Sequence, residues 1–181
     1  MNYFRAQALN NLWANHRLLS ACAALGEEEY RAPRVGFFPS IQATLCHILH
    51  VDAYYFAALI GDLTGQKTAG PETLGLEELA RRQRAQDSAL VEFCSTLDPQ
   101  CVVKLLREEG QVQVCVDERT DRILLHLFEH QIHHRGQVHC MLSATPVAPP
   151  QLDEFFLAAD ERFRRLDMRD LKLPEADVWL D

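Results

Sequence analysis

This sequence contains no apolar stretch close to the roughly 20 residues that a membrane-spanning helix requires. Its first residues, MNYFRAQALNNLWANH, place Asn, Arg and His where a secretory signal peptide has an apolar core. We therefore expect a cytoplasmic protein that neither crosses a membrane nor binds one.

Positive charge is also scarce, because 18 Lys and Arg stand against 26 Asp and Glu, for a net charge of −8. Nucleic-acid binding without sequence preference depends on neutralising phosphates with Lys and Arg, so this balance argues against a nucleic-acid partner. The six cysteines form no CxxC pair, and we expect free thiols, mostly small buried residues. They are Cys22, Cys46, Cys94, Cys101, Cys115 and Cys140.

What the sequence does have is helical periodicity in four long segments. A chain of 181 residues with 48% hydrophobic content is large enough for one domain with a proper core. Apolar residues recur at helical spacing, and Ser40 is a good N-cap for the second segment. The expected helices span 3–25, 40–60, 76–97 and 119–144.

Between the third and fourth helices, CVVKLLREEGQVQVCV (residues 101–116) alternates apolar and polar residues around Gly110, which predicts a small β-hairpin. The expected fold class is all-α, with a four-helix bundle over residues 1–160. One further short helix is expected within VAPPQLDEFFL (residues 147–157). The charged tail, residues 161–181, is expected to pack weakly.

Five of the eight histidines lie in HLFEHQIHHRGQVH, residues 126–139. At roughly 100° per residue, His130 and His134 fall on the same side of the helix as its apolar residues, whereas His126 and His133 lie outside that arc. His130 and His134 are four residues apart, so both imidazoles can reach a single ion. An isolated HxxxH is a weak motif, and a third ligand is needed.

The second helix supplies candidates in TLCHILHVDAYYF. His47 lies at the edge of the apolar face among small residues, while His50 is nearly opposite that face and is expected to be exposed. This argument indicates that His47, His130 and His134 converge on a metal ion. The alternative is that all three are histidines at the edge of the core, hydrogen-bonded to backbone or water.

Two charged residues near these histidines, Asp52 and Arg135, have two interpretations each. Asp52 lies within an apolar arc and needs a partner; it either orients a ligand histidine or binds a neighbouring helix or Arg135. Arg135 either binds an acidic substrate or ties helices together. Glu129 faces away from the core, so we expect a solvated carboxylate, and the sequence identifies no catalytic residue.

Three stretches give the sequence a family resemblance. LNNLWANHRLL, SIQATLCHILHVDAYYFAAL and HLFEHQIHHRGQVHCMLSATPVAPPQLDEF resemble the first, second and fourth helices of the DinB-like (DinB/YfiT-related) proteins, with HxxxHRGQ as the most characteristic part. The resemblance implies a four-helix bundle that holds a divalent metal through three side chains. In this sequence, the resemblance implies that these three side chains are His47, His130 and His134.

Three neutral imidazoles leave a coordination position open, which is the pattern of catalytic zinc sites rather than structural ones. Imidazole ligands suit transition metals better than Mg or Ca, so Zn is the expected ion, with Ni or Fe as alternatives. The resemblance implies a metal-dependent enzyme acting on a small-molecule thiol as an S-transferase, or else a hydrolase. The alternative is a non-catalytic or stress-response protein whose structural metal is closed by a fourth ligand such as His126 or Cys140.

Apolar residues outside the core arc indicate a surface for a partner. Leu125 and Ile132 lie there on the fourth helix, and Phe155 and Phe156 follow later in the chain. We expect these residues to form a homodimer interface.

Overall fold

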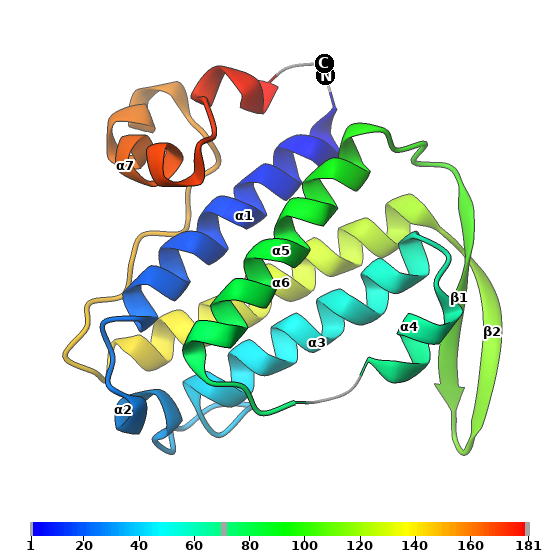
Figure 1. Ribbon diagram of the computed structural model, residues 1–181, viewed down its shortest axis with the longest axis horizontal. Helices are drawn as coiled ribbons and strands as arrows, with labels where there is room; N and C mark the ends of the chain where they lie inside the picture. Colours follow the sequence, from blue (N-terminus) through cyan, green and yellow to red (C-terminus); the bar gives the residue numbers. More distant parts are fainter. Residues whose placement is uncertain (1, 70–71, 180–181) are drawn as a thin grey trace.

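The computed structural model describes residues 2–69 and 72–179. Four long helices lie side by side and are joined at one edge by a β-hairpin (Figure 1). The mostly helical class with one antiparallel hairpin is therefore confirmed. The long helices are α1 (Tyr3–Cys22), α3 (Ile41–Leu59), α5 (Leu76–Ser95) and α6 (Thr120–Leu142).

Side-chain caps determine where two of these helices begin. The Asn2 side chain accepts a hydrogen bond from the backbone N–H of Arg5 at the start of α1. Ser40 does the same for Ala43 at the start of α3, which confirms the predicted cap. Each cap satisfies a backbone donor that the first helical turn leaves without a partner.

The helices pack most extensively as two pairs, α1 with α5 and α3 with α6. Their apolar residues form one buried cluster around Leu18, Ile41 and Leu142 and a second around Ala58, Leu90 and Leu124. The apolar arc predicted for the fourth helix is buried as expected. Its members are Ile123, Leu124, Leu127, Val138, Met141 and Leu142.

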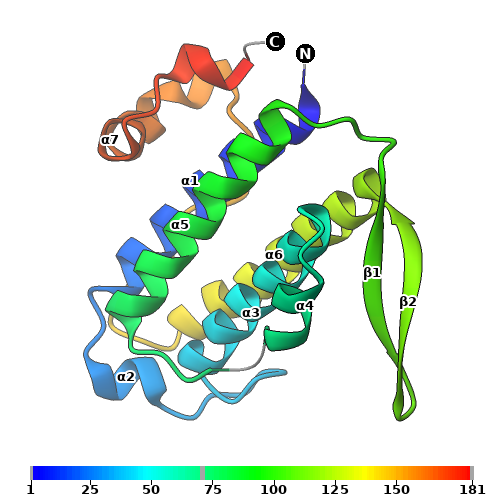
Figure 2. The ribbon, with the colours of Figure 1, turned by 45° about the vertical axis from the view of Figure 1, so that its right-hand side comes forward.

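The hairpin consists of β1 (Val102–Glu109) and β2 (Val112–Arg119), which pair antiparallel and turn at Gly110 with a φ of +66°. Figure 2 shows the hairpin at the edge of the helical layers, next to α4 (Leu63–Thr68). Gln66 of α4 covers the outer edge of β1, because its amide donates to the carbonyl of Lys104 and accepts from the N–H of Leu106.

The segment after α6 differs from the prediction. Residues 147–157 form no helix; their polar groups instead bind side chains from elsewhere, as when Asn10 donates to the carbonyl of Glu154. Phe156 has a φ of +48° and is 3% exposed, so it belongs to the core and is not part of a dimer surface. Leu125 and Ile132 are exposed, as expected.

The weak packing expected for residues 161–181 is wrong for the part that the structure describes. Residues Glu161–Leu171 form α7, which lies against α1 (Figure 1). Met168 and Val178 are buried beside Trp13, whose indole N–H donates to Asp167. The few apolar residues of this highly charged segment recur at helical spacing. They therefore lie on one face of α7, and that face packs against the core.

Two short helices, α2 (Glu27–Arg31) and α4, were not predicted. The signal for α4 was Asp62, whose side chain accepts from the N–H of Gly65 as an N-cap. All six cysteines are free thiols, as expected, but Cys101, Cys115 and Cys140 are exposed rather than buried. None of the helices in the described chain has the length and apolar character needed to cross a membrane.

Candidate metal centre

Three histidines from two helices meet between α3 and α6. His47 of α3 faces His130 and His134, which project from consecutive turns of α6. One ligand atom from each imidazole lies within 4.8 Å of those of the other two. The sequence argument selected these three residues, and the structure brings them together.

The spacing of the cluster suits a metal ion. The Nε2 atoms of His47 and His130 are 3.0 Å apart. Two imidazole nitrogens bound to one zinc ion at 2.0–2.1 Å and a tetrahedral angle would be about 3.3 Å apart. A movement of a few tenths of an ångström therefore converts this contact into a pair of ligands, and the donor set fits a divalent transition metal.

A chain of hydrogen bonds orients His134. Its Nδ1–H donates to Oε1 of Gln137 at 2.9 Å, and Nε2 of Gln137 donates to Nε2 of His133 at 2.9 Å. This arrangement places the proton of His134 on Nδ1 and leaves the Nε2 lone pair free for a ligand. Sequence analysis included Gln137 in the HxxxHRGQ motif but gave it no role; the signal was its position three residues after His134, on the same face of α6.

Burial keeps the cluster neutral. Together with the proximity of the other histidines, it lowers the pKa of His47 to about 4 and that of His130 to about 3. Burial also lowers the pKa of His134, against the opposing effect of its bond to Gln137. Neutral imidazoles are the form that binds metal ions, so no proton need leave these rings near pH 7.

An aromatic loop forms one wall of the cluster. The ring of Phe38, in the segment between α2 and α3, lies 4.4 Å from that of His47 and 5.6 Å from that of His134, centroid to centroid. Phe37 packs against Phe38 at 5.0 Å and is itself 79% exposed. The sequence argument treated this segment only as a connection, because nothing in its composition shows that it folds over the histidines.

No fourth histidine, cysteine or carboxylate joins the cluster within the described residues. His126 is exposed and meets Tyr55 in an edge-to-face contact, with ring centroids 5.0 Å apart, and its ring lies 6.4 Å from that of His130. Cys140 is exposed. Neither of the two residues considered as closing ligands is therefore in place to do so.

Asp52 and Arg135 belong to a second polar group, deeper between the helices, which we call the buried polar network. All four long helices contribute to it. Its members are Asn11 and Asn15 of α1, Asp52 of α3, Gln83 and Asp87 of α5, and Gln131 and Arg135 of α6, and each is at most 4% exposed.

Hydrogen bonds join the network into a ring. Arg135 donates to the side-chain oxygens of Asn11, Asn15 and Gln131. Both asparagines donate in turn to Asp87. Arg135 therefore ties α6 to α1.

Asp52 completes the ring. Gln83 donates to both carboxylates, at 2.7 Å to Asp52 and 3.1 Å to Asp87, and Gln131 donates to the same oxygen of Asp52. The binding partners of Asp52 thus lie on neighbouring helices, and none of its hydrogen bonds goes to a histidine. Burial raises the pKa of Asp52 well above its usual range.

Two further residues can now be placed. Glu129 is exposed, as expected. His50 was expected to be exposed, but it is half-buried, because α4 and the segment before α5 cover this side of α3. Its Nδ1 atom is buried and has no hydrogen-bond partner in the described chain.

A mostly helical protein with three histidines converging from two helices belongs to the class of helical proteins that can hold a metal ion between their helices. The DinB family model matches residues 2–165 of the chain. This protein is therefore a member of the DinB family. In a comparison with curated proteins, no sequence matched it.

Proposed function

We propose that this DinB-family protein is a metal-dependent enzyme whose four long helices form a metal-binding bundle of the DinB type. His47, His130 and His134 hold a divalent transition metal, zinc before nickel or iron, and the remaining coordination position takes a small-molecule thiol. The observation that supports this most directly is the approach of three neutral imidazoles to within 4.8 Å without a fourth protein ligand among the described residues.

A divalent ion with an open position lowers the pKa of a thiol or water that binds there. The chain itself supplies three functions around that position. The Gln137 side chain fixes the tautomer of His134, Phe38 excludes water from one side of the imidazoles, and burial keeps the rings unprotonated. No separate general base is needed, which agrees with the absence of an ionised carboxylate from the cluster.

The first experiment is metal analysis by mass spectrometry on untagged protein. We expect close to one zinc, nickel or iron ion per chain, lost in His130→Ala and retained in His126→Ala. The second variant is the matched control, because His126 is exposed on the same helix and lies outside the cluster. Protein that retains no metal even after zinc is added would refute the proposal.

A second experiment separates catalytic from structural metal. Cobalt substituted for zinc reports its ligands in the visible spectrum, and β-mercaptoethanol should change that spectrum if a coordination position is open. A spectrum that does not respond to thiols or to changes of solvent ligand would instead favour a closed, structural site.

We also propose that Leu125 and Ile132, which are 61% and 52% exposed, form part of a homodimer interface. Sedimentation of the wild type and of the double variant Leu125→Glu, Ile132→Glu tests this. A wild-type protein that sediments as a monomer at micromolar concentration would exclude the dimer.

A further inference from the structure

A cavity of about 430 Å³ lies between α6 and the segment that follows it. At roughly 100° per residue, the α6 residues that line it are centred on the opposite side of the helix from His130 and His134. The cavity is therefore separate from the metal centre. Its lining residues are Ile132, Arg135, Gly136 and His139 of α6 and Leu152 and Asp153 of the segment.

Hydrogen bonds from α1 hold the wall opposite α6 in place. Arg17 donates to the carbonyl of Gln151 at 3.1 Å. Asn10 donates to the carbonyl of Glu154 at 3.0 Å. The backbone is thus fixed on both sides of the two lining residues of this segment, so a ligand would meet a wall that is already formed and would need to order little on binding.

One lining residue is a buried cation that bonds to no carboxylate within the described chain. Arg135 is 4% exposed. Burial lowers its pKa to about 10, which still leaves the guanidinium charged near pH 7. All of its hydrogen bonds in the described chain come from Nη1 and go to neutral amide oxygens. A buried charge without an ionic partner is costly, and an anion placed beside it lowers that cost.

The other edge of this guanidinium is accessible. Within the described chain, Nε and Nη2 of Arg135 make no hydrogen bond, yet neither is among the buried side-chain atoms without a partner, so both reach solvent. Arg135 lines the cavity, and this edge is the part of its guanidinium that is free to meet a ligand there. Nε and Nη2 can donate in parallel to the two oxygens of one carboxylate, which is the bidentate geometry that arginine favours.

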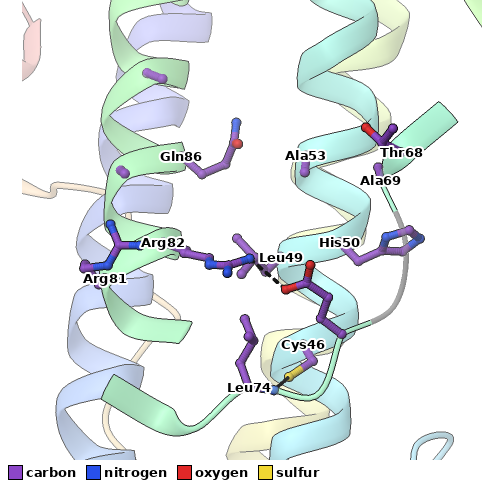
Figure 3. A pocket seen from close by; sticks show the side chains of 13 residues that line it. Cys46, Leu49, His50, Ala53, Thr68, Ala69, Leu74, Arg81, Arg82 and Gln86 are labelled. Carbon is purple, nitrogen blue, oxygen red and sulfur yellow. Dashed lines mark hydrogen bonds and ion pairs between the residues drawn. The ribbon is translucent and has the colours of Figure 1, made fainter. Parts of the chain in front are cut away.

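A second cavity with an arginine in its lining shows the difference. Between α3 and α5, Arg82 points across a cavity of about 410 Å³ and lies 2.7 Å from Glu72 (Figure 3). There the cation already has a carboxylate partner, and both side chains are exposed. An anion gains little by replacing such a pair, whereas at Arg135 it meets a desolvated cation with two free donors.

We propose that the cavity beside Arg135 binds a small monocarboxylic acid with an apolar body. The carboxylate accepts hydrogen bonds from Nε and Nη2 of Arg135, and the body lies against Ile132 and Leu152 and over Gly136. Gly136 leaves room there, because a Cβ atom added to it would meet nothing within 4 Å. Asp153 is exposed and disfavours a second negative charge on the ligand. The site does not depend on the metal centre.

The first test is a titration with benzoate, followed by nitrogen-15 NMR of the arginine Nε–H groups. Benzoate should shift the Nε–H resonance of Arg135, which through-bond experiments assign. Benzamide has nearly the same shape without the charge and should bind about tenfold more weakly, because the charge-assisted hydrogen bonds are lost. An Arg135 resonance that benzoate leaves unshifted, or shifts no more than benzamide does, would overturn the proposal.

A leucine at Gly136 should fill the cavity without disturbing the fold. Its side chain has room, it covers the turn of α6 before it, and it replaces a glycine within a helix. We expect Gly136→Leu to weaken benzoate binding about tenfold or more, at an unchanged or higher melting temperature. Cys140→Leu is the matched control, because Cys140 is exposed one turn further along α6 and does not line the cavity. Equal effects of the two variants would overturn the proposal.

A carboxylate can also bind a metal ion, so the titrations use protein freed of metal with a chelator. His130→Ala should then bind benzoate as the wild type does, whether or not the metal site holds an ion. Loss of benzoate binding in His130→Ala would place the carboxylate at the histidine cluster and overturn the proposal. A protein that binds benzoate at Arg135 but retains no zinc would refute only the proposed function.

Two further measurements test the class of ligand and a competing occupant. Inorganic phosphate has no apolar body and carries more charge near pH 7, so it should bind about tenfold more weakly than benzoate; equal affinities would overturn the assignment to a monocarboxylic acid. Ile132 also belongs to the proposed homodimer surface, so the affinity is measured at two protein concentrations and should be the same at both. An affinity that falls as the protein concentration rises would show that a second copy of the chain occupies the cavity, and would overturn the proposal.

Discussion

Two groups of polar side chains lie between the long helices, and they differ in burial and in the hydrogen bonds that their members make with one another. The buried polar network joins seven side chains from α1, α3, α5 and α6, each at most 4% exposed, and within the described chain Oδ1 of Asp52 is its one buried side-chain atom without a partner. In the histidine cluster His47 and His130 are half-buried, and Nδ1 of His130 is buried without a partner in the described chain.

The difference shows what each group is for. A network whose members are buried and hydrogen-bonded to one another across four helices fixes the positions of those helices. The histidine cluster keeps lone pairs directed at one point and leaves one side accessible. We therefore infer that the first group serves the fold, and under the proposed function the second serves binding. The following predictions test that division, from the largest expected effect to the smallest.

Removing the one cation of the network should have the largest effect on stability. Arg135→Met removes the positive charge that is linked to Asp87 through the two asparagines. It also leaves three side-chain oxygens without a hydrogen-bond donor. We expect a loss of about 3–5 kcal/mol in the free energy of unfolding, measured by urea denaturation. His47→Ala in metal-free protein should lose only about 1 kcal/mol; equal losses would contradict the division.

The network should also give the protein a pH-dependent stability. Burial raises the pKa of Asp87 from 3.8 to about 6. The folded protein therefore holds this proton more tightly than the unfolded chain does, so the stabilisation is complete below pH 3.8 and is lost as the pH rises through 6. A shift of about two units corresponds to about 3 kcal/mol. A carbon-13 NMR titration of the Asp87 carboxyl should have its midpoint near 6, and a midpoint near 4 would show that the carboxyl is not desolvated.

Metal should stabilise the protein only through the histidine cluster. Free zinc at 100 times its dissociation constant should raise the free energy of unfolding by about 2.7 kcal/mol, and a chelator should reverse this. The effect should vanish in His47→Ala and persist in Asn15→Ala, a variant of the network. Stabilisation by zinc that survives in His47→Ala would place the ion elsewhere.

The smallest effect is expected at Gln137, which contacts a candidate ligand but not the ion. Gln137→Ala removes the acceptor that orients His134 and should weaken zinc binding about tenfold, or about 1.4 kcal/mol. Gln137→Glu keeps an acceptor oxygen and should retain most of the affinity. Competition with a chromophoric chelator measures both, and wild-type affinity in Gln137→Ala would exclude this role.

Much of the fold followed from local patterns. Helical periodicity and the Ser40 cap predicted the long helices to within a few residues, and alternation around Gly110 predicted the hairpin. The face of α6 that carries His130 and His134 was also predictable, because helical geometry places residues four apart on one side. The errors fell where tertiary packing outweighs local preference. Phe156, for example, has a left-handed φ, which the apolar periodicity of the sequence does not predict.

The sequence by itself determined which four long helices form, where the apolar face of α6 lies and which three histidines can meet. Only the tertiary structure decided what stands around them. It placed Gln137 against His134, folded Phe38 over the imidazoles, and set Arg82 opposite Glu72 across a cavity. The physical reason is the range of the interactions. Periodicity and capping act within a few residues of the chain, whereas the partners of a side chain in the interior come from segments that meet only after the helices have packed.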